Sequence, residues 1–97
     1  MYARVGSYDM GSASRDDAVR SFEGTQSRIE QAEGIRGGLM LISTDGDEAL
    51  TITLWESEEA LRASEQLAQQ ARGQAAGSAG MTAREAKSYE VAIQFGI

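Results

Sequence analysis

The sequence predicts an α+β fold in which a four-stranded antiparallel sheet carries two helices on one face. Strand-like alternation occurs near both ends of the chain, and a hairpin pattern occupies the middle. Two segments with helical spacing separate these strands. The predicted order of elements is therefore βαββαβ, within a single domain over residues 1–97.

The first strand and the first helix are predicted over residues 2–10 and 15–33. The strand alternates between two faces, and Gly6 in its middle indicates a bulge or a close backbone approach. Ser14 is an expected N-cap, with acidic residues in the first turn that complement the helix dipole. The side chains that recur at helical spacing are Ala18, Val19, Phe22, Ile29 and Ala32, and Gly34 is the expected stop.

The segment from Leu39 to Glu56 predicts a β-hairpin. Two apolar, β-branched runs, 39–44 and 49–56, flank Asp45 and Gly46, a pair suited to a tight turn with positive φ. The acidic residues of this turn lack the ligand spacing of an EF-hand loop, so a turn is favoured over a calcium site.

A second helix is predicted after Ser57, followed by a flexible loop and a final strand. The helical stripe consists of Ala60, Leu61, Ser64, Leu67, Ala68 and Ala71. The segment 72–83 is small, flexible and free of proline, which favours a loop. In the last segment, 84–97, alternation predicts a strand with one apolar face, formed by Tyr89, Val91, Ile93, Phe95 and Ile97.

This order of elements is typical of the ferredoxin-like fold, with both helices on one face of the sheet. The strand from Leu39 to Thr44 then lies at an edge, although both of its faces are apolar. An exposed edge of this kind is a liability for a monomer. Two sheets packed face to face would bury it, so the sequence predicts a homodimer.

Composition excludes several classes of function. The chain contains no His, Cys, Pro or Asn, so the usual ligands of zinc, copper and haem iron are missing. We therefore expect no metal and no cofactor. The net charge of −6 without a basic block argues against nucleic acid as a partner. No apolar run approaches the roughly 20 residues that span a bilayer, and the start does not resemble a signal peptide, so we expect a cytoplasmic protein without membrane contact.

The run "EGIRGGLMLISTDGDEALTITLWESEEALRAS", residues 33–64, resembles the antibiotic biosynthesis monooxygenase-like family of dimeric α+β barrels. The similarity lies in a glycine-rich approach to the second strand, an acidic turn and a "W-x-S-x-E-A-L" junction from strand to helix. The matching residues are Gly34, Gly37, Gly38, Asp45, Gly46, Trp55, Ser57, Ala60 and Leu61. These residues are turn formers, a cap and core positions rather than catalytic groups.

The resemblance implies a ligand pocket between sheet and helices and a dimer built by opposed sheets. In some members it also implies oxygenation of an aromatic or polyketide-like substrate without metal or flavin. The haem-degrading members use an axial His, which this sequence lacks. Two interpretations stay open beside an oxygenase: a non-catalytic small-molecule-binding dimer and a structural interaction domain.

The candidate substrate-binding residues are Arg4, Tyr8, Phe22 and Trp55. Arg4 is expected to stabilise a phenolate by charge and Tyr8 to hydrogen-bond it, whereas alternation places Ser7 on the opposite face. Each has a structural alternative: an ion pair for Arg4, a sheet position for Tyr8 and a core position for Phe22. We expect Trp55 to fill the seam between layers first and to form a pocket wall second, with 73–80 as a lid.

Overall fold

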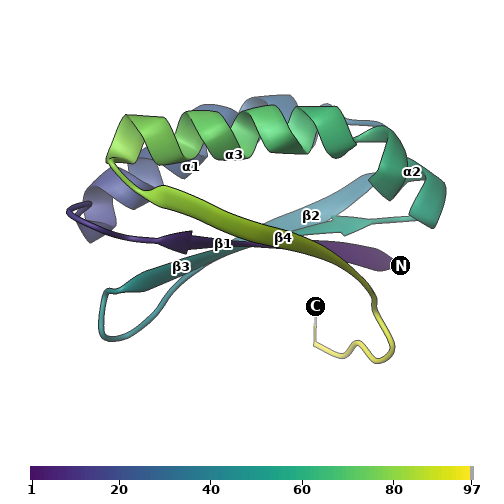
Figure 1. Ribbon diagram of the computed structural model, residues 1–97. Coiled ribbons are helices and arrows are strands. Elements are labelled where there is room, and N and C mark those ends of the chain that lie inside the picture. The colour runs from purple at the N-terminus through teal and green to yellow at the C-terminus, as the bar shows by residue number, and fades with distance from the viewer. Residues whose placement is uncertain (97) are drawn as a thin grey trace.

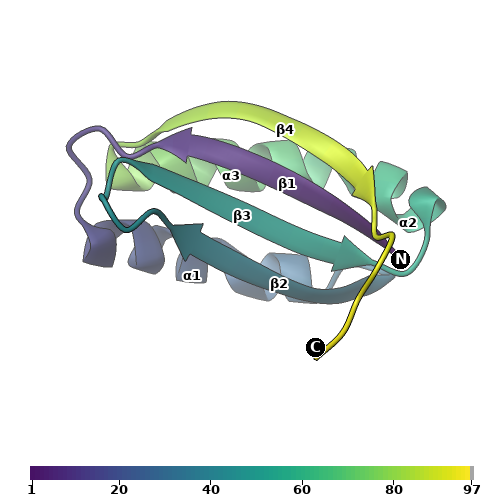
Figure 2. The same ribbon diagram turned by 90° about the horizontal axis from the view of Figure 1, so that it is seen from below.

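One twisted sheet lies beneath a layer of helices in the computed structural model, which describes residues 1–96 (Figure 1). The elements are β1 (Tyr2–Asp9), α1 (Arg15–Glu30), β2 (Ile35–Ile42), β3 (Glu48–Trp55), α2 (Glu58–Ala63), α3 (Glu65–Ala79) and β4 (Thr82–Glu90). The strand order is β2-β3-β1-β4 with antiparallel neighbours, as seen from below in Figure 2. The predicted ferredoxin-like α+β fold is therefore confirmed.

The start of α1 follows the sequence prediction. The Ser14 side chain accepts a hydrogen bond from the Asp17 backbone N–H at 3.1 Å, and two aspartates lie in the first turn. The helix ends three residues before the predicted end, with Gln31 as its C-cap. Gly34 then turns the chain into β2 with φ of 84°, a left-handed value that glycine adopts without strain.

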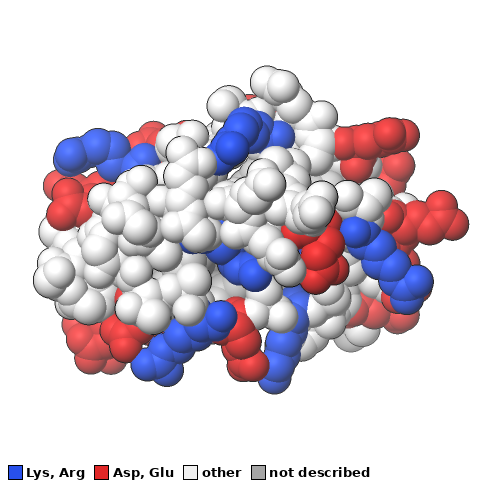
Figure 3. All heavy atoms as spheres, turned by 45° about the horizontal axis from the view of Figure 1, so that its top comes forward, with Lys and Arg blue, Asp and Glu red and all other residues white. Residues whose placement is uncertain are grey.

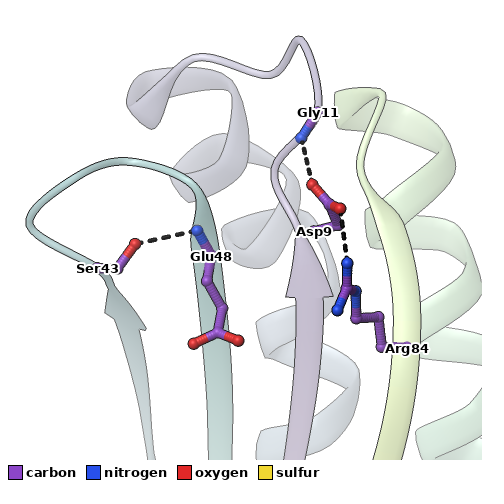
Figure 4. A network of polar contacts seen from close by, with 5 residues as sticks. All are labelled: Asp9, Gly11, Ser43, Glu48 and Arg84. Atoms are coloured by element: carbon purple, nitrogen blue, oxygen red, sulfur yellow. Dashed lines mark hydrogen bonds and ion pairs between the residues drawn. The ribbon is translucent and has the colours of Figure 1, made fainter.

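Local hydrogen bonds fix one end of the sheet (Figure 4). In the hairpin turn the Ser43 hydroxyl accepts from the Glu48 N–H at 3.0 Å, and Gly46 has the expected positive φ. At the neighbouring end of β1, the Asp9 carboxylate accepts from the Gly11 N–H at 3.1 Å and from Arg84 at 2.9 Å. The turn contacts therefore support the β2–β3 hairpin, and the Asp9 contacts join the ends of β1 and β4.

The predicted loop over residues 72–83 is wrong, because 72–79 belong to α3 and β4 already begins at Thr82. The chain bends at Ser64 and then continues as a helix to Ala79, where Gly80 ends it with φ of 78°. Alanine has the highest helix propensity, and the buried alanines of α3 are Ala71, Ala75 and Ala76. Their burial outweighs the cost of the glycines, so the segment is not a loop and no lid is expected there.

The predicted length of the final strand is also wrong. β4 ends at Glu90 because its neighbour β1 begins opposite, at Tyr2. One further bond joins the Val91 N–H to the Met1 carbonyl. The rest of the tail passes under the sheet toward the β2 side, with Phe95 89% exposed (Figures 1 and 2). The predicted position of Ile97 lies outside the described residues.

The two faces of the sheet differ in their cover. Toward the helices, the core consists of Tyr8, Met10, Ala18, Ala49, Ala76 and Met81. On the edge strand β2, which has the predicted position, Met40 and Ile42 pack against this core. Leu39 and Leu41 point to the other face and are nearly half exposed. No helix of residues 1–96 covers that face.

Glycine substitutions test the helical assignment of residues 73–79. A Cβ at Gly73 meets nothing within 4 Å, so Gly73→Ala should raise the free energy of unfolding by about 0.5 to 1 kcal/mol. A loop would give no such gain. Gly34→Ala is the matched control: its Cβ would lie 2.5 Å from the Ala60 Cβ at a positive φ. It should cost about 2 kcal/mol or more in urea unfolding at equal protein concentration.

Candidate functional site

A small cavity of about 30 Å³ lies between the sheet and the helices. β1 contributes Arg4, Gly6 and Tyr8, and β3 contributes Thr51 and Thr53. The helices close it with aromatic, aliphatic and small side chains and with one arginine: Phe22, Thr25, Ile29, Ala68, Ala71, Arg72 and Ala75. A volume of this size holds a water molecule or one small functional group rather than a whole ligand.

A larger cleft of about 300 Å³ adjoins this cavity between α1 and the β2 edge. The two share Phe22, Ile29 and Thr53 as wall residues. Gly37 and Gly38 form part of its β2 wall, beside Ile35 and Arg36, and contribute no side chain to it. The body of a small ring compound therefore fits in the cleft, with one substituent directed into the cavity.

Arg4 is buried, with 6% of its surface exposed. Its guanidinium donates to the Ser64 hydroxyl at 3.0 Å and to the Leu61 carbonyl at 2.7 Å. It also lies 5.7 Å from the centre of the Trp55 ring, within cation–π range. Burial lowers the pKa of Arg4 from its ordinary value, the charge of Glu65 raises it, and the charge of Arg72 lowers it. Arginine nevertheless remains protonated in proteins, so the site keeps a buried positive charge.

Tyr8 is buried beside the same cavity. Burial raises the pKa of its phenol above the ordinary value, and a hydrogen bond from Thr51 and the charge of Arg72 partly offset that rise. The phenol is therefore neutral near pH 7. In that state Tyr8 can donate a hydrogen bond to an oxyanion, whereas it is a poor base.

Trp55 fills the seam between the sheet and α2, as the sequence analysis favoured. The ring is 1% exposed, and its Nε1–H donates to the Thr53 hydroxyl at 2.9 Å. A void of about 20 Å³ beside the ring is lined by Trp55, Arg4, Leu67 and others. The ring therefore supports Arg4 and lies behind the cavity wall rather than in it.

The structure brings three of the four candidate residues to one cavity. Arg4, Tyr8 and Phe22 line it, and Trp55 contacts Arg4 from behind. Ser7 lies on the helix-free face, as alternation predicts, and its hydroxyl donates to the Glu85 carbonyl at 3.4 Å. The register shift near Gly6 places the extra residue in β4, so it does not turn Ser7 toward the cavity.

Sequence reasoning missed Arg72 and the two threonines, Thr51 and Thr53. Arg72 escaped attention because its segment was taken as the start of a loop. The available signal was its spacing: Arg72 follows Ala68 by one helical turn and precedes Ala75 and Ala76 by the next. The threonines pair with Gly6 and Arg4 across the sheet, a register that the hairpin pattern alone does not specify.

Ionisable groups elsewhere on the described chain form no further site. Residues 1–96 contain no group of three or more carboxylates or other metal ligands that could hold an ion. Acidic and basic side chains are interspersed on the face that Figure 3 shows, without a block of one sign. Within the same range, every helix is too short or too polar to cross a bilayer.

No protein-family model matches the sequence, and no curated protein matches it significantly. Solved structures do match the fold. SnoaB, a cofactor-independent oxygenase from Streptomyces nogalater, is 17% identical with a TM-score of 0.72, over 96% of this chain and 94% of its own.

Two further structures agree over nearly the full length. A "putative antibiotic biosynthesis monooxygenase" from Deinococcus radiodurans is 19% identical with a TM-score of 0.68, covering 100% of this chain and 98% of its own. A "putative monooxygenase" from Shewanella loihica is 17% identical with a TM-score of 0.71, covering 96% and 95%. The chain thus has the fold of the antibiotic biosynthesis monooxygenase structures, which confirms the resemblance at the level of the fold.

Substitution of Trp55 tests its structural role. Trp55→Ala should lower the free energy of unfolding by about 3 to 5 kcal/mol, because it removes a fully buried large ring. Trp55→Phe keeps most of the volume and should cost about 1 kcal/mol, the contribution of one hydrogen bond. Denaturant unfolding followed by circular dichroism measures both. Equal stability of the wild type and Trp55→Ala would contradict the burial of the ring.

Proposed function

We propose that the protein is a cofactor-independent monooxygenase that acts on a small aromatic or polyketide-like compound. The observation that carries this proposal is the buried Arg4 guanidinium beside Tyr8, at the inner end of a cleft whose walls include Phe22 and Ile29. The fold shared with a cofactor-independent oxygenase supports it. The absence of His and Cys from the sequence also favours chemistry that needs no metal or haem.

Oxygenation without a cofactor requires an electron-rich substrate anion, because O2 accepts electrons readily from such an anion. A positive charge beside a substrate oxygen stabilises its anionic form, and a neutral phenol can donate a hydrogen bond to it. In this proposal Arg4 supplies the charge and Tyr8 supplies the hydrogen bond. Phe22 and Ile29 form the apolar wall and exclude water from the ring.

The overall reaction balances with O2 as the sole oxidant. At an activated ring CH2, the carbon loses both hydrogens and gains a double bond to one oxygen atom of O2. The other oxygen atom leaves with the two hydrogens as water, so that CH2 + O2 gives C=O + H2O. The carbon supplies all the electrons that reduce O2, and the proton released from the substrate passes to solvent through the open cleft.

The alternative is a homodimer that binds a small molecule, or serves a structural role, without catalysis. One feature of the structure favours it: the described residues that line the inner cavity include no carboxylate or imidazole to act as a base. Turnover of any compound separates the two functions. The proposal includes a cytoplasmic location, as expected from the sequence, and a single dimeric α+β barrel domain over residues 1–97.

The homodimer in this proposal forms through the helix-free face of the sheet. Three large apolar side chains on that face are about half exposed: Leu39, Leu41 and Tyr89. The tail with Ile93 and Phe95 passes below the same face (Figure 1). A second copy would cover both the face and the apolar edge strand, which otherwise stay exposed to solvent.

An oxygen-uptake assay tests the catalytic proposal. Anthrone, incubated with protein in air, should yield anthraquinone with one O2 consumed per anthrone. EDTA should not change the rate. Arg4→Gln should lower it about a hundredfold, since it removes a preorganised charge, whereas Arg62→Gln on the exposed side of α2 should have no effect. A rate equal to the protein-free background would contradict catalysis and favour the binding alternative.

A charge placed on the helix-free face tests the dimer. Light scattering of the wild type at micromolar concentration should give twice the monomer mass. Leu39→Lys/Leu41→Lys should give the monomer with unchanged circular dichroism, because both side chains are exposed in one subunit. Gln69→Lys/Gln70→Lys adds the same charge on the helix layer and should stay dimeric. A monomeric wild type would overturn this part of the proposal.

A further inference from the structure

Arg72 lines the inner cavity without a hydrogen-bonding or ion-pair partner in residues 1–96. It extends from α3 over β1, where an added Cβ on Gly6 would come within 3.0 Å of the Arg72 Cδ. The lack of a side chain at Gly6 therefore leaves room for the arginine stem. Its charge lowers the pKa of both Arg4 and Tyr8, so the three groups lie close enough to interact.

The two arginines of the cavity have no acidic partner. Among residues 1–96, Arg72 takes part in no ion pair or hydrogen bond. The partners of Arg4 are neutral: a hydroxyl, a carbonyl and an aromatic ring. The charge of Glu65 raises the pKa of Arg4 through space, but Glu65 is exposed and forms no ion pair with either arginine within 4.0 Å.

In the adjoining cleft, in contrast, Arg36 already has a counter-charge, because it forms an ion pair with Glu56 at 2.6 Å. Glu30 of the same cleft accepts a hydrogen bond from Gln26 at 2.6 Å, a neutral group that does not offset its charge. Two like charges held together are unfavourable, and an anion bound between them offsets that cost. The uncompensated positive charge is therefore concentrated at the inner cavity.

The residues that line the cavity also determine whether a ligand group must be ionised before it binds. The cavity lining contains no carboxylate or imidazole, and Tyr8 holds its own proton. A weakly acidic group at this position would have to lose its proton to solvent, because no side chain of the lining acts as a base. The complementary group is one that is ionised in solution before it binds, and the cavity volume of about 30 Å³ suits a single carboxylate.

We infer that the ligand is an aromatic carboxylate, with its ring in the cleft between α1 and β2 and its acid group between Arg4 and Arg72. Tyr8 donates its hydrogen bond to the neighbouring substrate oxygen, as in the proposed reaction. Arg72 is the residue that selects acids over neutral analogues, because it has no other partner in the described chain. The inference rests on the proposed function only for the location of the site, since binding does not require turnover.

Binding of a matched pair of compounds tests the inference. The probes are 1-hydroxy-2-naphthoate and its neutral isostere 1-hydroxy-2-naphthamide, measured by calorimetry. The wild type should bind the acid at least about tenfold more tightly than the amide, the effect of one charge-assisted contact. Added salt should weaken binding of the acid and leave binding of the amide unchanged.

Variants of Arg72 identify the source of the preference. Arg72→Gln should reduce it several-fold and leave only the part that Arg4 contributes, and Arg72→Lys should retain more of it because the charge remains. Arg62→Gln removes an exposed arginine of the same helix layer and should behave like the wild type. Circular dichroism and thermal unfolding confirm that each variant is folded.

The outcomes separate this inference from the proposed function. Acid preference that depends on Arg72, without O2 uptake for any substrate, supports the inference and contradicts the oxygenase. O2 uptake on neutral substrates that is unchanged in Arg72→Gln supports the oxygenase and overturns the inference. Equal binding of acid and amide by the wild type, or no binding of the acid at millimolar concentration, overturns the inference as well.

Discussion

The helix layer depends on the hydrogen bonds that the buried Arg4 guanidinium donates to Ser64 and Leu61. The guanidinium has no ion-pair partner in the described chain, so neutral groups must satisfy it, and the end of α2 supplies them. Leu61 lies in the last turn of α2 and Ser64 at the bend between α2 and α3, and the Leu61 carbonyl accepts from the Ser64 hydroxyl at 2.7 Å as well as from Arg4. A cation is also favourable at a helix C-terminus. The bend at Ser64 therefore gives Arg4 its acceptors, and Arg4 in turn stabilises the bend.

The same interaction positions the site. Trp55 lies under the guanidinium and is held by Thr53, whose backbone pairs with Arg4 across the sheet. These contacts hold the Arg4 guanidinium in place at the cavity in the absence of a ligand. Such preorganisation matters for catalysis and for binding, because no reorganisation is needed when negative charge appears. Gly6 adds to it by leaving space for the stem of Arg72, so one strand shapes both sides of the cavity.

The elements that local patterns determine could be predicted from the sequence, and those that depend on distant partners could not. Ser14 and Ser57 cap helices, and Gly46 turns the hairpin, as their sequence neighbours indicate. The end of β4 depends instead on where β1 begins, a constraint that alternation in the last segment does not contain. The helix through 73–79 depends on the burial of its alanines, while its composition resembles that of a loop. Arg4, Tyr8 and Phe22 could be assigned to one cavity by face and family, whereas Arg72 could not, because its helix was not expected.

The two faces of the sheet separate assembly from ligand binding. Arg4 and Tyr8 point toward the helices, whereas Leu39 and Leu41 point to the opposite side through neighbouring positions of the same sheet. Contacts between two copies on the helix-free face would therefore rigidify the strands that carry the arginine and the tyrosine without covering the cleft. The helices α1 and α3 remain joined across the layer by the Arg28 to Gln74 hydrogen bond. A ligand entering beside α1 would meet a rigid floor and a helical wall, and its affinity would be set by the unpaired charge at the inner end rather than by the size of the opening.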